Sequence, residues 1–300
     1  MHANLILAAG VLAVDAAGLL AAPSVLATHA LLGAAILVLF ALSAPIHWGL
    51  IHEAIHGLLA TGSRSNRAAG RALSVLLLYS FDVVRLGHLL HHSDTGHQFD
   101  RPDLGLPGET RWRAALRHYG HVLGGHYVVT AVLPVLILLP QGLVQRMVLR
   151  ASESGGSATA PVRDAALRWF GQRRRVNAIR ADVLAGAGLV GLAAFLYGPA
   201  WPALAAALYG RAVLISLLDN MPHYGTATPE IAHIPAFRLP RWLSPAVMNH
   251  HLHRWHHQRP NLAWHALPEE FRRTGGRYDL GYLTGILRQL RGPNWASEGG

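Results

Sequence analysis

The sequence predicts an all-α integral membrane protein with four transmembrane helices in two hairpins, further interfacial or re-entrant helices, and a cytoplasmic cap rich in histidine. Of its 300 residues, 51% are hydrophobic and only 14% are charged, whereas soluble domains carry roughly 25% charged residues. Long apolar runs alternate with polar segments rich in arginine, and most of the 20 histidines lie in a few short windows. These features favour one membrane-embedded domain over residues 1–300.

Four apolar runs predict the transmembrane helices, and they cover about residues 4–22, 25–48, 183–197 and 201–218. As a helix, the first run extends about 28 Å, which is close to the thickness of the hydrocarbon layer. No basic residues precede it as they would in a secretory signal, so we expect this run to remain in the mature chain.

Three further segments are predicted outside these helices. Residues 71–92 mix a leucine-rich stretch with polar residues, and residues 127–148 are apolar but interrupted by Pro134 and Pro140. Both segments are expected to be interfacial or re-entrant. Residues 150–180 are polar and include a stretch rich in serine and glycine, which predicts a flexible loop.

The distribution of arginine predicts the orientation of the helices. The turns near Pro23 and Pro199 carry no charge, whereas the segments 61–117, 150–180 and 233–291 are rich in arginine. Cytoplasmic loops of membrane proteins carry an excess of basic residues. All three arginine-rich segments, and the histidine clusters within or beside them, are therefore expected on the cytoplasmic side.

Charge and cysteine content narrow the classes of protein. The net charge is +10, and the 26 basic residues are all arginine. A basic balance suits nucleic acid, anionic lipid or an acidic carrier, but the high apolar content argues against nucleic acid as a partner. The chain has no cysteine, which excludes disulfides, cysteine-ligated iron–sulfur clusters and thiolate zinc sites. Any metal must be held by histidine, carboxylate or carbonyl groups.

Three histidine motifs have the spacing of metal ligands. His52 and His56 lie four residues apart, which puts both on one face of a helix. The pattern His-x-x-His-His occurs twice, and its members are His88, His91, His92, His253, His256 and His257. Adjacent histidines on a helix diverge by about 100°, so each trio can serve two metals.

His223 follows the last apolar run directly, and two readings of it are open: a lone interfacial histidine or a further ligand. Eight or nine imidazoles are too many for one ion and suit two metals with open positions. Spacing does not distinguish iron from zinc. The soluble di-iron bundle, which is rich in glutamate, is disfavoured because the four apolar runs contain no glutamate.

These motifs resemble the three histidine boxes of the membrane fatty acid desaturase superfamily, which also includes alkane hydroxylases and carotenoid ketolases. The matching segments are His52-Glu-Ala-Ile-His56-Gly, His88-Leu-Leu-His91-His92 and Leu252-His253-Arg-Trp-His256-His257. The resemblance extends roughly from Ala44 to Phe271. Asn66-Arg67 and the segment Pro-Asn-Leu-Ala-Trp-His-Ala-Leu-Pro after the third motif are similar to bacterial fatty acid desaturases, which implies a bacterial inner membrane.

The resemblance implies a di-iron centre and assigns its ligands. It implies nine of them: His52, His56, His88, His91, His92, His223, His253, His256 and His257. In acyl-CoA desaturases, an asparagine four residues before the additional histidine assists one metal through water. This chain has Asp219 at that position, which could bind a metal directly or only orient a ligand. No catalytic side chain beyond the metal centre is implied.

The implied activity is the oxygen-dependent insertion of a double bond into an acyl chain. It requires two iron ions, dioxygen and a separate reductant of the ferredoxin, rubredoxin or cytochrome type. The substrate would be an acyl-lipid, an acyl-CoA or an acyl-carrier protein, and membrane lipid surrounds the protein. A docking surface for the reductant is expected at the arginines of 163–180, or at Arg272, Arg273 and Arg277. Contact of the same arginines with lipid headgroups is the simpler interpretation.

Two alternative functions are open. A hydroxylase or ketolase acting on an alkane, carotenoid or acyl chain would use the same centre. A membrane metal transporter or metal-binding protein is disfavoured. Transporters place their ligands near the middle of the bilayer, whereas these histidines lie at the ends of the apolar runs and in polar segments.

Two charged residues, Asp15 and Arg211, interrupt apolar runs. They could pair across helices, or Arg211 could line the site near Asp219.

Overall fold

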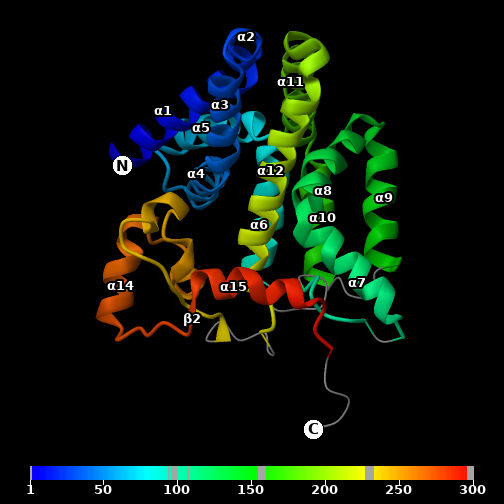
Figure 1. The fold of residues 1–300 in the computed structure, drawn as a ribbon. Coiled ribbons are helices and arrows are strands. Elements are labelled where there is room, and N and C mark those ends of the chain that lie inside the picture. The colour runs from blue at the N-terminus through cyan, green and yellow to red at the C-terminus, as the bar shows by residue number, and fades with distance from the viewer. Residues whose placement is uncertain are drawn as a thin grey trace.

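The chain folds into a set of long helices with a smaller cap of short helices at one end (Figure 1). The computed structural model describes residues 2–93, 95, 101–106, 108–154, 160–226 and 233–295. Almost all of its regular structure is helical. The described strands, β1 (Phe237–Arg238) and β2 (Leu280–Gly281), pair in parallel within the cap. The prediction of an all-α membrane protein is confirmed.

The N-terminal part contains two long apolar helical segments. Their elements are α1 (His2–Ala16), a π-helical turn (Ala17–Ala21), α2 (Ala22–Thr28), α3 (Ala30–Leu42) and α4 (Ala44–His56). The segments Ala3–Thr28 and Ala30–His56 are each long and apolar enough to cross a membrane. They cover the predicted runs 4–22 and 25–48, and His29, with φ of −140°, separates them.

Two consecutive helices make a third apolar segment: α11 (Arg173–Tyr197), a 3-10 turn (Gly198–Ala200) and α12 (Trp201–Asn220). The 48 residues together would extend about 72 Å if straight, more than twice the hydrocarbon thickness. Gly198 breaks the helix with φ of +48°. Ala193 and Ala207, from opposite sides of this break, belong to one buried cluster. The predicted runs 183–197 and 201–218 both lie in this segment.

A fourth apolar segment was not among the predicted spans. It consists of α7 (Arg111–Gly120), a π-helical turn (His121–Gly125), α8 (His126–Val132) and a 3-10 turn (Leu133–Leu138), and α9 (Gln141–Ser154) follows. Arg111–Leu138 is long and apolar enough to span. The segment 127–148 was predicted as interfacial or re-entrant, and that placement stays a prediction. Its helical structure is broken at Pro140, which has no N–H to continue a helix.

Four helical segments that could cross a membrane are thus present among the described residues; the last of them contains two of the four predicted runs, and Arg111–Leu138 is additional. Their arrangement in two hairpins stays a prediction. The expected flexible loop at 150–180 is corrected for the described residues, because α10 (Ala160–Gly171) and the start of α11 occupy most of it. Val176 and Ile179 pack with Ile137 and Val144, and this apolar face stabilises helices in a segment whose polarity suggested a loop.

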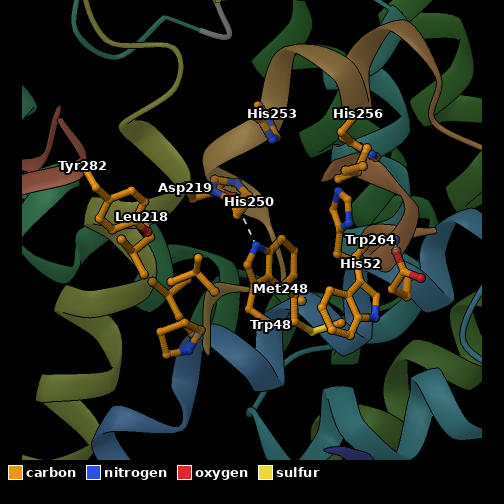
Figure 2. Close-up of a pocket in the computed structure, with 16 residues that line it drawn as sticks. Trp48, His52, Leu218, Asp219, Met248, His250, His253, His256, Trp264 and Tyr282 are labelled. Atoms are coloured by element: carbon orange, nitrogen blue, oxygen red, sulfur yellow. Dashed lines mark hydrogen bonds between the residues drawn. The ribbon is translucent and has the colours of Figure 1, made fainter. Parts of the chain in front are cut away.

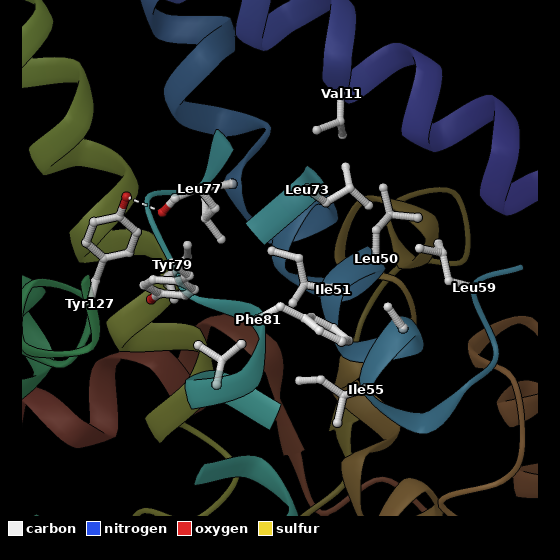
Figure 3. Close-up of a cluster of buried hydrophobic side chains, with 14 of the residues drawn as sticks. Val11, Leu50, Ile51, Ile55, Leu59, Leu73, Leu77, Tyr79, Phe81 and Tyr127 are labelled. Carbon is white, nitrogen blue, oxygen red and sulfur yellow. Dashed lines mark hydrogen bonds between the residues drawn. The ribbon is translucent and has the colours of Figure 1, made fainter. Parts of the chain in front are cut away.

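α5 (Ser63–Leu76) and α6 (Phe81–Ser93) meet at an angle of 102°. This shape is that of a broken span or a re-entrant loop, and the interfacial placement of 71–92 stays a prediction. Gly70 allows the close approach of the surrounding helices, since a Cβ there would lie 2.6 Å from the Ala54 Cβ and 2.7 Å from the Phe81 ring. Phe81, Ile51 and Leu73 belong to the buried cluster that fixes α4, α5 and α6 together (Figure 3).

A buried ion pair joins the apolar segments. The Arg211 guanidinium lies 2.6 Å from Asp15 Oδ1 and donates to His47 Nδ1 at 2.7 Å. Arg211 is 1% exposed and Asp15 is 0% exposed, and the guanidinium also stacks on the Phe40 ring at 4.1 Å. The pairing of Asp15 with Arg211 across helices is confirmed. An unpaired charge in a lipid-embedded segment is costly, so this pair ties α1 to α12.

The cap follows the last apolar segment. Its helical elements are 3-10 turns at Ser244–Val247, His250–Leu252, Trp264–Ala266 and Gln289–Arg291, with α13 (His253–Gln258), α14 (Leu267–Arg273) and α15 (Tyr282–Arg288) between them. Trp255, Leu267 and Phe271 form its apolar core. This core packs α13 against α14, and so orients the histidines of α13 toward those of α4 and α6.

Candidate metal centre

The first two histidines come from the end of α4. His52 and His56 lie one turn apart with ring centroids 4.9 Å apart. The helix ends immediately afterwards at Gly57, whose φ of +82° is the left-handed conformation that glycine adopts at helix ends. Both imidazoles therefore project from the last turn of a buried helix toward the cap.

The second motif divides between two groups. On α6, the Nε2 atoms of His88 and His92 lie 3.0 Å apart, and the Nε2 atoms of His88 and His56 lie 2.9 Å apart. His91 points elsewhere, and its Nε2 lies 3.1 Å from that of His257. The divergence expected for adjacent helical residues is what separates His91 from its neighbours.

The third motif divides in the same way. His253 and His257 lie one turn apart on α13, with Nε2 atoms 3.0 Å apart. His256 instead approaches His92, at 2.9 Å between Nε2 atoms. α13 follows a tight bend in which Met248 and Asn249 have positive φ. This bend turns the short helix so that its histidines contact both groups.

His223 joins the second group from the turn after α12. Its Nε2 lies 3.0 Å from that of His253. A buried clamp holds this turn: Asp103 Oδ2 accepts the Gly225 N–H at 3.0 Å, and Arg101 donates to the Thr226 carbonyl. The reading of His223 as a lone interfacial histidine is therefore disfavoured by its position.

All nine histidines predicted from the sequence are thus brought together. They form two groups, His52, His56, His88, His92 and His256 in one, and His91, His223, His253 and His257 in the other. Within each group the ligand nitrogens lie within 4.8 Å of one another. Two neighbouring groups of convergent imidazoles suit two metal ions.

The geometry fits metal ions better than it fits hydrogen bonds. His88 Nε2 lies within 3.0 Å of two other Nε2 atoms, and a neutral imidazole nitrogen donates at most one hydrogen. With a metal–nitrogen bond of about 2.1 Å, two ligands at a right angle lie about 3.0 Å apart, as these atoms do. In addition, His52 Nε2 is buried without a hydrogen-bond partner. Cations bound between the rings would satisfy these nitrogens.

Burial keeps the cap histidines in the form that binds metal. It holds the pKa of His253 and His256 well below the ordinary value, and the charges of neighbouring histidines lower both further. The pKa of His223 is lowered by the same causes. Since metal binds the deprotonated ring, protons compete weakly with metal here at neutral pH.

A pocket that is partly open to solvent lies beside the first group (Figure 2). His52, His253 and His256 form part of its wall, and Trp48, Leu218 and Met248 give it an apolar lining. An apolar pocket with a few polar groups is typical of a site for a small or lipid-like ligand. The reactive side of the histidine groups thus faces a space suited to hydrocarbon.

Asp219 lines the same pocket. Its carboxylate accepts from Trp48 Nε1 at 3.1 Å and lies 3.2 Å from His126 Nε2. Sequence reasoning missed His126, which the π-helical turn at His121–Gly125 directs toward α12, and it left His250 unassigned. His250 also lines the pocket, with its ring 4.4 Å from that of His253. The clustering of histidine near position 250 was the available signal.

The fold and the paired histidine groups define a membrane-embedded metalloprotein whose centre faces an apolar pocket. Comparison with known proteins gives the family: the family model described as fatty acid desaturase matches residues 26–284, and the chain belongs to this family. No curated protein matches the sequence. The protein is therefore an integral membrane oxidoreductase of the di-iron desaturase and hydroxylase type, which acts on acyl lipids with a redox partner.

Proposed function

We propose that this protein is an oxygen-dependent acyl-chain desaturase. The observation that supports this most directly is the shared wall: His52 and His256 belong to the first histidine group and also line the apolar pocket. A methylene carbon held in this pocket would lie next to the metal centre. Positioning of this kind decides which C–H bonds react.

The nine histidines would hold two iron ions, five and four ligands respectively, and leave room for dioxygen. The bound irons would supply the redox chemistry that takes hydrogen from an unactivated carbon. In balance, dioxygen accepts four electrons, two from the broken C–H bonds and two from an external donor. With the two hydrogens of the substrate and two protons from solvent, it leaves as two water molecules, and the chain gains a double bond.

The side chains around the pocket would bind the acyl chain, orient it and shield its reacting carbons from water. Trp48, Leu218 and Met248 would hold the acyl chain and exclude bulk water from the reacting carbons. Asp219 would fix the Trp48 indole by accepting its N–H. From its place in the pocket wall it would also support one metal, through water or by orienting a ligand. The arginine-rich side would face the cytoplasm of a bacterium, where the acyl substrate and the reductant are found.

Metal content and product mass test this proposal together. We expect about two irons per chain in purified protein, and a loss of two hydrogens from an acyl species in expressing cells. His52→Ala and His223→Ala should each lower the iron content, since they remove one ligand from different groups. His265→Ala is the matched control, because His265 is exposed and belongs to neither group.

The outcomes separate the alternatives. Gain of one oxygen atom by the product would replace desaturation with hydroxylation or ketone formation at the same centre. Uptake of metal into sealed vesicles, without a changed lipid, would indicate a transporter. Active protein that contains no metal would refute the proposal altogether.

A further inference from the structure

Two half-buried arginines, Arg85 and Arg175, lie against Trp169 where α6 meets α10 and α11, and the exposed Arg67 lies near Arg85. The Arg175 guanidinium lies 3.5 Å above the Trp169 ring, and that of Arg85 lies 5.9 Å from the same ring. Arg67, on α5, is near enough to Arg85 to repel it, as Arg175 does. We refer to Arg67, Arg85 and Arg175 with Trp169 as the arginine face.

The positive charge of this face is only partly offset by the protein, since the Asp82 carboxylate acts on Arg85 from a distance but pairs with Arg71. In the part of the chain that the structure describes, neither Arg67, Arg85 nor Arg175 forms an ion pair with a carboxylate. The nearest acids are already engaged, because Arg71 contacts both Asp82 and Asp182. Like charges held close together are unfavourable unless an anion binds them. The face is therefore complementary to an acidic partner.

The face adjoins the metal centre on a different side from the pocket. Arg85 precedes His88 by three residues on α6, so the two side chains share one helical face. None of the residues that line the pocket comes from α5, α6, α10 or α11. A ligand at the pocket mouth would not reach this face, which argues against the headgroup of the acyl substrate as its occupant.

We propose that the arginine face docks a small acidic iron–sulfur protein of the [2Fe–2S] ferredoxin class, which delivers electrons to the metal centre. This inference rests on the proposed function. Each reduced ferredoxin loses one electron as its cluster returns to the diferric form, and the centre gains that electron. Two such transfers supply the pair that dioxygen needs beyond the two C–H bonds. Arginine and tryptophan are the side chains most often dominant in protein interfaces, and opposite charges accelerate encounter.

The cap offers a competing basic surface that is less complementary to an acid. It includes Arg272, Arg273 and Arg277, all of them exposed. Arg273 is already paired with Glu270 at 2.8 Å, and Glu270 also pairs with Arg259 at 3.2 Å. This pairing offsets the charge of Arg259 and Arg273, whereas Arg272 and Arg277 form no ion pair among the described residues, so reversing these two changes the net charge as much as reversal at the arginine face. The cap surface therefore supplies a matched control for charge reversal.

The test compares three full-length proteins in nanodiscs of neutral phosphatidylcholine: the unmodified chain, Arg67→Glu/Arg175→Glu and Arg272→Glu/Arg277→Glu. The binding of an acidic [2Fe–2S] ferredoxin is measured by fluorescence at low and moderate salt, a readout that does not depend on turnover. Reversal of two charges at the arginine face should weaken binding about tenfold or more and flatten its salt dependence. The cap variant should bind within about twofold of the unmodified chain.

Reduction of the iron centre by dithionite, which needs no docking surface, should proceed equally in all three proteins. Equal ferredoxin affinity in all three, a loss confined to the cap variant, or no binding to the unmodified chain would overturn the proposal. If reversal at the face changed only the association with anionic phosphatidylglycerol, the face would bind lipid instead. Failure of the proposed function is distinct, because no protein would then form an unsaturated product with any reductant.

Discussion

Replacement of Asp103 by asparagine should release the clamp that holds His223. The Asp103 carboxylate accepts from Arg101 Nε at 2.8 Å and from Arg101 Nη2 at 2.9 Å. It also accepts the Gly225 N–H and the Asn294 side-chain amide. Arg101 is 3% exposed and Asp103 is 1% exposed. Asparagine keeps the size of the side chain but leaves the guanidinium without its counter-charge.

The expected magnitude follows from this burial. Removing one partner of a buried ion pair costs about 3–5 kcal/mol, because the remaining charge stays away from water. For cooperative unfolding of a chain of this size, the midpoint temperature should fall by about 6–20 °C. The turn that carries His223 should loosen, and the second histidine group should lose iron before the first.

The assay is thermal unfolding in detergent together with iron content by mass spectrometry. Asp164→Asn is the control, since its ion pair with Arg163 is exposed on both sides and surface pairs contribute little. A variant at Asp103 that kept both its iron content and its unfolding temperature would refute the clamp as the support of His223.

The same carboxylate predicts a pH dependence. Burial opposes the ionisation of Asp103, but the hydrogen bonds and charge of Arg101 prevail and lower its pKa below the ordinary value of 3.8. A lowered pKa stabilises the fold above the unfolded value, and this stability is lost as the pH falls through the folded value. The stability difference between the unmodified chain and Asp103→Asn should therefore stay constant from about pH 8 to 5 and shrink below about pH 4.

Three further changes test the packing, the membrane-embedded charge and the pocket. Phe81→Ala removes a ring that is 1% exposed and should destabilise by about 3–5 kcal/mol in denaturant unfolding; an unchanged midpoint would contradict the role of this cluster in fixing α6. Arg211→Leu should strongly reduce the yield of folded protein, because the buried Asp15 carboxylate would keep only His47 beside it, and Asp15→Leu/Arg211→Leu should restore part of the yield. Equal yields from the two variants would exclude the loss of this pairing as the cause. Gly49→Ala places a Cβ 2.5 Å from Met248 Sδ and should displace the Met248 side chain into the pocket. Because the pocket would then be shorter, the products should shift toward shorter acyl chains, as measured by gas chromatography.

The sequence determined the chemistry of the centre because metal ligation depends on local spacing. Residues four apart, such as His52 and His56, share a helical face in any fold. The divergence of His91 from His92 follows from the same helix geometry and predicts two groups. The apolar runs likewise identify a membrane protein, since the length needed to cross lipid is fixed by the bilayer.

One prediction from the sequence was wrong for a physical reason. Polarity suggested a loop at 150–180, but the apolar face formed by Val176 and Ile179 stabilises helix there once it has Ile137 to pack against. By contrast, the placement of 127–148 as interfacial or re-entrant stays a prediction, and the helix break at Pro140 is where the proline in the sequence suggested an interruption. The overall polarity of a segment does not show which few apolar residues will find a packing partner elsewhere in the chain.

Only the tertiary structure decided which histidines share a group and what else surrounds them. His256 belongs to the group formed by α4 and α6, whereas His257 belongs to the group of His223. The contacts of His256 with His92 and of His257 with His91 each join residues more than 160 positions apart. No sequence pattern marks His47 as a partner of the Asp15–Arg211 pair, or His126 as a partner of Asp219. Local geometry fixes where a side chain points on its own helix, but the packing of distant helices fixes what it meets, and that depends on the whole chain.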